Sequence, residues 1–114
     1  MDLEAARQKE QATLPTAVAG ARQLREAMRS PDSFKLTSAS IMNDGAVCYE
    51  FRSQNGFGGM NSGQAVLSLS GQFKTNEMSG FAVLWNRECA GKTGMDETWK
   101  VGYGAGFHGM FSEK

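Results

Sequence analysis

Few residues in this chain could act as nucleophiles, acid–base groups or metal ligands. The candidates are Cys48, Cys89 and His108, the one histidine among 114 residues. A thiol or histidine site also needs a third group that orients the base, and the sequence shows no such group. Two thiols and one histidine fall short of the four ligands of a structural zinc site. We therefore predict no catalytic residue and no metal site. By number alone, the cysteines fit one disulfide or two buried thiols.

Two further patterns suggest cofactor binding or acid–base catalysis. Residues 104–109 match G-x-G-x-x-G, but the dinucleotide fingerprint needs a helix after it within a full βαβ unit, which we do not expect here. A carboxylate pair at glycosidase spacing is conceivable, but the sequence does not show which carboxylates lie together. We expect solvated surface carboxylates and no cofactor. The carboxylates considered are Glu50, Glu77, Glu88, Asp96 and Glu97.

The most unusual stretch is NGFGGMNSG, residues 55–63, which sets one Phe and one Met among glycines and asparagines. It has two interpretations. As a long hairpin connection, its glycines supply positive-φ positions and its Phe folds back onto the core. As a binding loop, its glycines let a partner approach the backbone while apolar and amide side chains make the contacts. The candidate binding residues are Asn55, Phe57, Gly58, Gly59, Met60 and Asn61.

One helix and several short strands must position this loop. Pro15 suits a first helical turn, so we expect the main helix to start there, after a helical lead-in or frayed helix over residues 1–13. Apolar residues recur at spacings of three and four along this helix, and Pro31 ends it. Gly20, in the middle of the helix, is expected to mark a close approach to a sheet.

Strands are predicted over residues 34–42, 46–52 and 65–70, with a bulge in the first because its alternation is imperfect. Turns are predicted at 43–45 and 70–72. The run 80–86 is apolar on both faces, which is typical of a central strand, and residues 97–103 alternate as an edge strand would.

These elements predict an α+β fold, an N-terminal helix packed on a four- or five-stranded antiparallel sheet of the cystatin-like kind. We expect a single domain over residues 14–103 and a Gly- and aromatic-rich tail of loose order at 104–114. The loop is expected at one end of the sheet, beside the start of the helix or the tail. The predicted core comprises Val18, Leu24, Met28, Val47, Tyr49, Phe51, Leu67, Leu69, Phe81 and Val83.

Three segments carry a pattern typical of one group of proteins: residues 29–36 (RSPDSFKL), residues 47–63 (VCYEFRSQNGFGGMNSG) and the later Cys89. They resemble a family of small uncharacterised bacterial proteins, many predicted to be exported or lipid-anchored. That family places a (D/S)PDS turn after a helix, then a Val-Cys strand, then Asn-x-(Phe/Tyr)-Gly-Gly. Here Met60 stands where an aromatic residue is usual, and Tyr49 where glycine is common.

The resemblance covers roughly residues 20–90 and implies an extracytoplasmic compartment. An oxidising compartment would favour a disulfide between Cys48 and Cys89. In the chain-entropy model, the loop closed by such a bond is worth roughly 4 kcal/mol of stability.

Charge and hydropathy limit the function further. Lys plus Arg and Asp plus Glu both number 12, so the chain lacks the positive field of a non-specific nucleic-acid binder. The sequence contains no run of about 18 apolar residues, which is the length needed to span a bilayer. The first residues lack the apolar segment of a signal peptide. The chain is therefore either cytoplasmic or exported after removal of a signal peptide, and the resemblance favours a periplasmic or secreted protein.

We expect a non-enzymatic extracytoplasmic domain that binds a protein or a cell-envelope glycan. Two alternatives remain open. One is a small hydrolase that uses a Cys or His with a carboxylate. The other is a purely structural component of the envelope.

Overall fold

A computed structural model describes the backbone of residues 3–107 and the side chains of residues 12–107. It confirms the predicted α+β fold, with an N-terminal helix packed on a five-stranded antiparallel sheet of order β4-β3-β2-β1-β5. The strands are β1 (Lys35–Met42), β2 (Val47–Gln54), β3 (Met60–Leu67), β4 (Phe73–Thr75) and β5 (Gly94–Asp96). The helices are α1 (Leu3–Glu26), the 3-10 turn η1 (Pro31–Ser33), α2 (Phe81–Glu88) and α3 (Thr98–Gly104).

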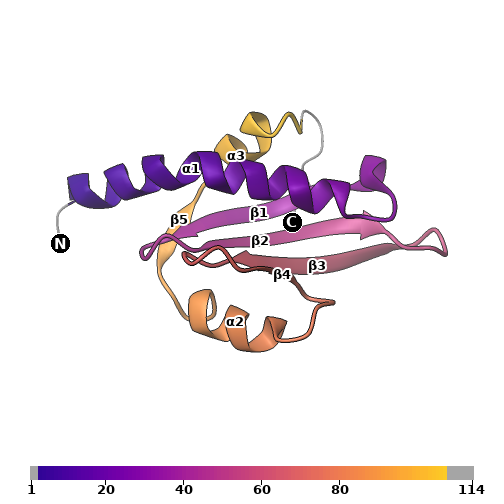
Figure 1. Cartoon of the computed structure of the whole chain (residues 1–114). Coiled ribbons are helices and arrows are strands. Elements are labelled where there is room, and N and C mark those ends of the chain that lie inside the picture. The colour runs from indigo at the N-terminus through magenta and orange to yellow at the C-terminus, as the bar shows by residue number, and fades with distance from the viewer. Residues whose placement is uncertain (1–2, 108–114) are drawn as a thin grey trace.

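The elements form three layers (Figure 1). Helix α1 runs lengthwise across one face of the sheet with α3 beside it, and α2 covers part of the opposite face. The last turn of α1 lies at the same end of the molecule as the β2–β3 turn. The loop therefore lies beside the end of α1, and the predicted position beside the start of the helix is wrong. A position beside residues 108–114 of the tail stays a prediction, because those residues lie outside the described part of the chain.

Helix α1 is continuous from Leu3 to Glu26 and contains Pro15 in its interior. The predicted start at Pro15 is therefore wrong, because the good helix formers before it extend the helix through the proline. Inside the first strand, the predicted bulge is confirmed as a register shift between Leu36 and Ser38. The turn at residues 43–45 is also confirmed, with Gly45 at φ 98°.

Two predicted strands are helices. Residues 81–86 fall in α2 and Gly80 precedes it. The helix buries Phe81 and Leu84 on one side and leaves Val83 71% exposed. A short apolar run fits a strand or a helix equally well, and here the spacing of three governs burial. Residues 98–103 fall in α3, which follows Glu97, and Trp99 and Tyr103 stack across one turn of it at 5.5 Å.

The main core lies between α1 and the sheet. Five of the ten predicted core residues are buried: Leu24, Val47, Tyr49, Phe51 and Phe81. Three are half-buried: Val18, Met28 and Leu67. Two predictions are wrong, since Leu69 and Val83 are 72% and 71% exposed. Leu69 lies in the turn after β3, which ends two residues earlier, and Val83 is on the outer face of α2.

The end of the described chain also contributes to the core. Phe107 is 2% exposed and meets Phe34 edge to face at 5.3 Å. Residues 108–114, including His108, lie outside the described residues. For them the expected loose order of the tail stays a prediction.

A second, smaller core lies under α2 and is joined to the sheet covalently. Cys48 of β2 and Cys89, just after α2, form a disulfide with Cα atoms 6.0 Å apart. Both cysteines pack with a group of apolar residues: Met42, Ala46, Val66, Phe81 and Leu84. Since α2 has only eight residues, which is too short to be stable alone, the bond and this cluster hold it on the sheet.

We expect no thiol of the native protein to react with an alkylating agent in denaturant without reductant. After reduction, the mass should rise by two alkyl groups, because both cysteines are in the bond. Intact mass spectrometry of protein purified under oxidising conditions makes this measurement. Two alkylated cysteines before reduction would contradict the bond.

The expected close approach of helix and sheet is confirmed at Gly20. A Cβ atom added at Gly20 would lie 2.5 Å from the Tyr49 hydroxyl oxygen. That hydroxyl donates a hydrogen bond of 2.6 Å to the carbonyl oxygen of Ala17. Burial raises the pKa of Tyr49, so the phenol keeps its proton and remains a donor. Tyr49 is fully buried and has no room to move aside.

Gly20→Ala should therefore destabilise the fold by about 1–2 kcal/mol, because overpacking exceeds the gain of about 1 kcal/mol in helix propensity. In a Tyr49→Phe background, the same change should cost at least about 0.5 kcal/mol less, since the clashing oxygen is gone. Urea unfolding of the four proteins measures this coupling. Equal costs in both backgrounds would show that the two residues do not interact as described.

Candidate functional site

The β2–β3 turn is short and held by hydrogen bonds. The N–H of Asn55 donates to the carbonyl of Gly59 at 2.7 Å, and the N–H of Gly58 donates to the carbonyl of Asn55 at 3.2 Å. Gly58 has φ 88°, in the left-handed region where glycine is favoured. A tight turn followed by a left-handed glycine is a common way to close a hairpin with a short loop. Only residues 56–58 lie between Asn55 and Gly59, the pair that closes the turn.

The side chain of Asn55 organises the turn from inside. Its Oδ1 accepts the N–H of Phe57 at 2.8 Å and the N–H of Gly59 at 3.1 Å. Its Nδ2 donates to Oδ1 of Asn61 at 3.2 Å. The side chain of Gln54 adds a bond of 3.1 Å to the carbonyl of Gly58. The turn is therefore stabilised by polar bonds to its own backbone, without help from an apolar core.

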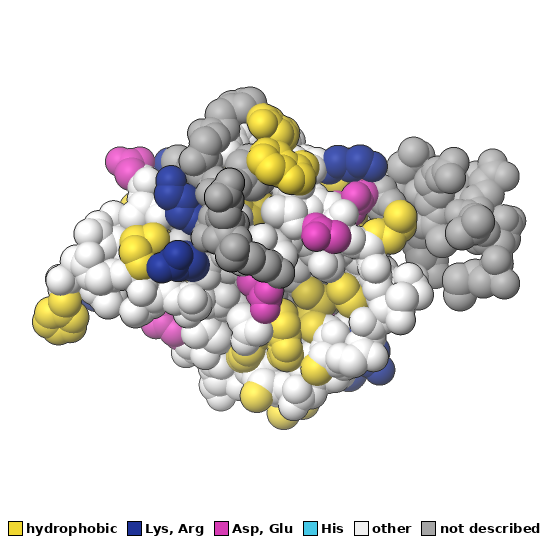
Figure 2. Space-filling model, turned by 180° about the vertical axis from the view of Figure 1, so that it is seen from behind, with side chains coloured by type: hydrophobic (Ala, Val, Ile, Leu, Met, Phe, Trp, Pro, Cys, Tyr) yellow, Lys and Arg dark blue, Asp and Glu magenta, His cyan; other side chains and the backbone are white. Residues whose placement is uncertain are grey.

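Phe57 stands at the tip of this turn and is 99% exposed. Figure 2 shows hydrophobic atoms standing out from the end of the molecule that carries the turn. The hairpin interpretation required Phe57 to fold back onto the core, and the structure contradicts that. The exposure predicted for a binding loop is confirmed for Phe57 and also for Met60, which is 41% exposed.

The candidate binding residues divide between the turn and the following strand. Asn55, Phe57, Gly58 and Gly59 belong to the turn, whereas Met60 and Asn61 begin β3. The predicted nine-residue loop is thus too long, and of its glycines only Gly58 has positive φ among the described residues. Gly63 instead leaves room for the ring of Phe51.

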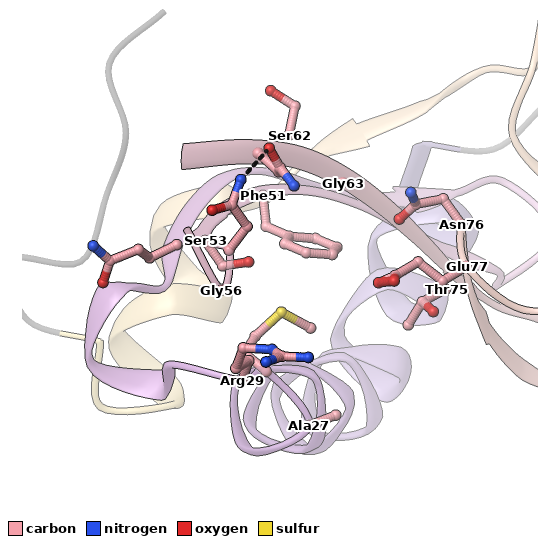
Figure 3. Close-up of a pocket in the computed structure, with 14 residues that line it drawn as sticks. Ala27, Arg29, Phe51, Ser53, Gly56, Ser62, Gly63, Thr75, Asn76 and Glu77 are labelled. Carbon is pink, nitrogen blue, oxygen red and sulfur yellow. Dashed lines mark hydrogen bonds between the residues drawn. The ribbon is translucent and has the colours of Figure 1, made fainter. Parts of the chain in front are cut away.

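A groove of about 460 Å³ opens between residues 27–29, which follow α1, the end of the β2–β3 hairpin and the segment after β4 (Figure 3). The ring of Phe51 forms its apolar centre, and Arg29 comes from the segment that follows α1. Asn76 and Glu77 lie across from the hairpin. Most of the lining is polar: Arg29, Ser53, Gln54, Asn55, Asn61, Ser62, Thr75, Asn76 and Glu77.

Gly63 is needed to form the groove. It pairs with Phe51 across β2 and β3, and a Cβ atom at Gly63 would lie 2.5 Å from the Phe51 ring. The ring therefore occupies the space that a side chain at Gly63 would fill. Phe51 is only 5% exposed and stacks on Phe34 at 5.6 Å, so the floor of the groove is part of the core and is rigid.

The groove carries one basic and one acidic side chain on opposite walls. Arg29 and Glu77 make no ion pair or hydrogen bond with any other described residue. Arg29 lies close to the turn, since a Cβ atom at Gly56 would be 3.2 Å from its Nη1. The sequence analysis did not consider Arg29 and treated Glu77 only as a surface carboxylate, because no local pattern links residues 29, 55 and 77 before the chain is folded.

Four of the groups considered for catalysis have structural roles. Cys48 and Cys89 are bonded and offer no thiol. Among the carboxylates, Glu50 accepts hydrogen bonds from Ser38 and Gln64, and Asp96 accepts from Thr98. No cluster of three or more potential metal ligands occurs in the described part of the chain. No helix in that part is long and apolar enough to cross a bilayer.

Comparison of the chain with models of protein families, with curated proteins and with solved structures finds no match. The candidate site therefore rests on its own geometry, an exposed aromatic residue on an internally bonded turn beside a polar groove.

Asn55→Ala should loosen the turn, because it removes the acceptor of two backbone N–H groups and the donor to Asn61. We expect faster amide exchange at Phe57 and Gly59 and a loss of about 1 kcal/mol in unfolding free energy. Asn55→Asp is the matched control, since it keeps the acceptor and loses only the donor. Exchange at these amides measured by NMR should stay slow in Asn55→Asp. Equal exchange in all three proteins would contradict the role of Asn55.

Proposed function

We propose that this chain is a non-enzymatic, extracytoplasmic binding domain whose contact surface is the β2–β3 tip and the adjoining groove. The observation that carries the proposal is the complete exposure of Phe57 on a turn whose own hydrogen bonds hold it in place. A fully exposed aromatic side chain buries no apolar surface and therefore does not stabilise the fold. It is available as an anchor, and aromatic anchors dominate the energetics of many interfaces.

The order of the turn supports this proposal. Association costs free energy when loops and side chains must be ordered on binding. Here Asn55 already bonds the backbone on both sides of Phe57, so the tip is preorganised. An aromatic residue adds large contact area with few rotatable bonds, as in antibody loops.

The groove supports recognition of a polar partner. Its amide and hydroxyl groups offer both hydrogen-bond donors and acceptors, and Arg29 and Glu77 supply one charge of each sign. Such a surface suits a protein segment or a glycan better than an apolar small molecule.

Two observations support an extracytoplasmic location. The disulfide between Cys48 and Cys89 is typical of oxidising compartments. Residues 47–63 resemble a family with many members predicted to be exported. The same bond argues against a cysteine hydrolase, because neither sulfur is a thiol.

The Phe57→Ser, Met60→Ser double variant tests the proposal. We expect its unfolding free energy to stay within about 1 kcal/mol of the parent, because both side chains are on the surface. Binding to a panel of immobilised envelope proteins and soluble envelope glycans should be lost. Surface plasmon resonance against the same panel makes the comparison.

Val83→Ser is the matched control, since it removes an apolar side chain of similar exposure from α2, on the other face of the sheet. It should bind as the parent does. Loss of binding in both proteins, or in neither, would refute a contact surface at the tip.

A further inference from the structure

The outer edge of β3 is only half covered. Strand β2 pairs with β3 along its whole length, from Met60 to Leu67. Strand β4 pairs with the other edge over Ala65–Leu67 alone. The side chain of Asn76 extends this cover by one residue, because its Oδ1 accepts the N–H of Gln64 at 3.0 Å. No described strand lies beside residues 60–63 on that edge.

Two pairs of backbone groups point out from this uncovered part. In an antiparallel ladder, successive residues direct their N–H and C=O groups to alternate sides. Gln64 faces the β4 side, since the N–H of Asn76 donates to its carbonyl at 2.8 Å. Met60 and Ser62 must then face the same way. The hairpin end agrees, because Gly59 bonds to Asn55 of the partner strand, which turns Met60 outward.

The outer edges of β1 and β4 are partly occupied by hydrogen bonds from neighbouring segments. On β1, Ala39 donates to Thr98 Oγ1 at 3.0 Å and accepts from the N–H of Glu97 at 2.8 Å. Beyond it, the bulge after Leu36 interrupts the edge. Such bulges keep other strands from pairing. On β4, the N–H and C=O of Thr75 are both bonded to Met78.

The exposed part of β3 has no such protection. Residues 60–63 contain no charged residue, no proline and no bulge in their pairing with β2. This edge borders the groove, whose lining includes Asn61, Ser62 and Gly63. A chain that paired with Met60 and Ser62 would lie against β3 beyond Asn76 and pass between Glu77 and the hairpin tip.

We propose that the partner is an extended polypeptide segment that adds to the sheet as a strand beside Met60–Gly63. This rests on the proposed function and specifies its partner class. Within the described part of the chain, the N–H and C=O groups of Met60 and Ser62 have no partner, and they supply the main-chain bonds of β-strand addition. Alternate side chains of the added strand face the α1 side of the sheet, where the groove lies, because side chains on a strand alternate between faces. A glycan has no alternating N–H and C=O row to match this edge.

Ser62→Pro tests the inference without breaking the sheet. The Ser62 N–H points outward, so proline removes no bond to β2, and proline is tolerated at such edge positions. Ser62→Ala is the matched control because it keeps the N–H and loses only the hydroxyl. The probe is a library of short random peptides displayed on phage, selected on the parent protein, with selected sequences synthesised for calorimetry and NMR.

We expect selected peptides to slow amide exchange of Met60 and Ser62 by about tenfold or more. Ser62→Pro should weaken binding by a similar factor. Ser62→Ala, which keeps the N–H and removes only one hydroxyl of the groove lining, should weaken it clearly less. Peptides N-methylated at the residues that face β3 should also bind about tenfold more weakly. These peptides keep the test valid if Ser62→Pro does not fold.

Three results would overturn strand addition. One is selected peptides that leave Met60 and Ser62 exchange unchanged. Another is failure to select any peptide. The third is concentration-dependent dimerisation that Ser62→Pro abolishes, which would make a second copy of the chain the occupant of this edge. In the first two cases the binding function of the tip is tested separately with Phe57→Ser. If this variant loses binding to the selected peptides or to glycans, the tip is still a binding site. If Phe57→Ser has no effect on binding, both the binding function of the tip and strand addition at β3 are refuted.

Discussion

The contact between Gly20 and Tyr49 determines where α1 lies, and the candidate site depends on that position. With no side chain at Gly20, the helix reaches the phenol of Tyr49, which bonds back to Ala17 at 2.6 Å. A larger residue would lift the helix or move it along the sheet. Anchored there, α1 ends at Glu26 while β2 and β3 continue past it. The groove is the space over the sheet that the helix does not cover.

The two faces of the sheet are secured by different means. On the α1 side a large apolar core suffices. On the α2 side the cluster is small, and a disulfide joins the end of α2 to β2. The disulfide joins β2 at Cys48, near the start of that strand and away from the β2–β3 turn, which is held by its own hydrogen bonds. Asn55 is therefore central to the tip, since it is the side chain that bonds the turn on both sides of Phe57.

Sequence patterns predicted the elements whose signals are local. The spacing of apolar residues in α1, the alternation in β2 and the glycine at position 20 all predicted what the structure shows. Residues 80–86 were misassigned because a short apolar run does not distinguish strand from helix. The groove was missed because Arg29, Phe51 and Glu77 meet only through the tertiary fold. The turn did carry a usable signal, since Asn before the turn and glycine at its fourth position are typical of short hairpin loops.

The central claim is that the free protein presents an ordered tip beside an open strand edge. Residue-resolved amide hydrogen exchange of the protein alone tests it most directly. The account predicts slow exchange at Phe57 and Gly59, which donate to Asn55, and at Asn61 and Gly63, which point toward β2. It predicts fast exchange at Met60 and Ser62. Met60 and Ser62 amides as protected as those of Asn61 and Gly63 would contradict the account, because the edge would then already be covered.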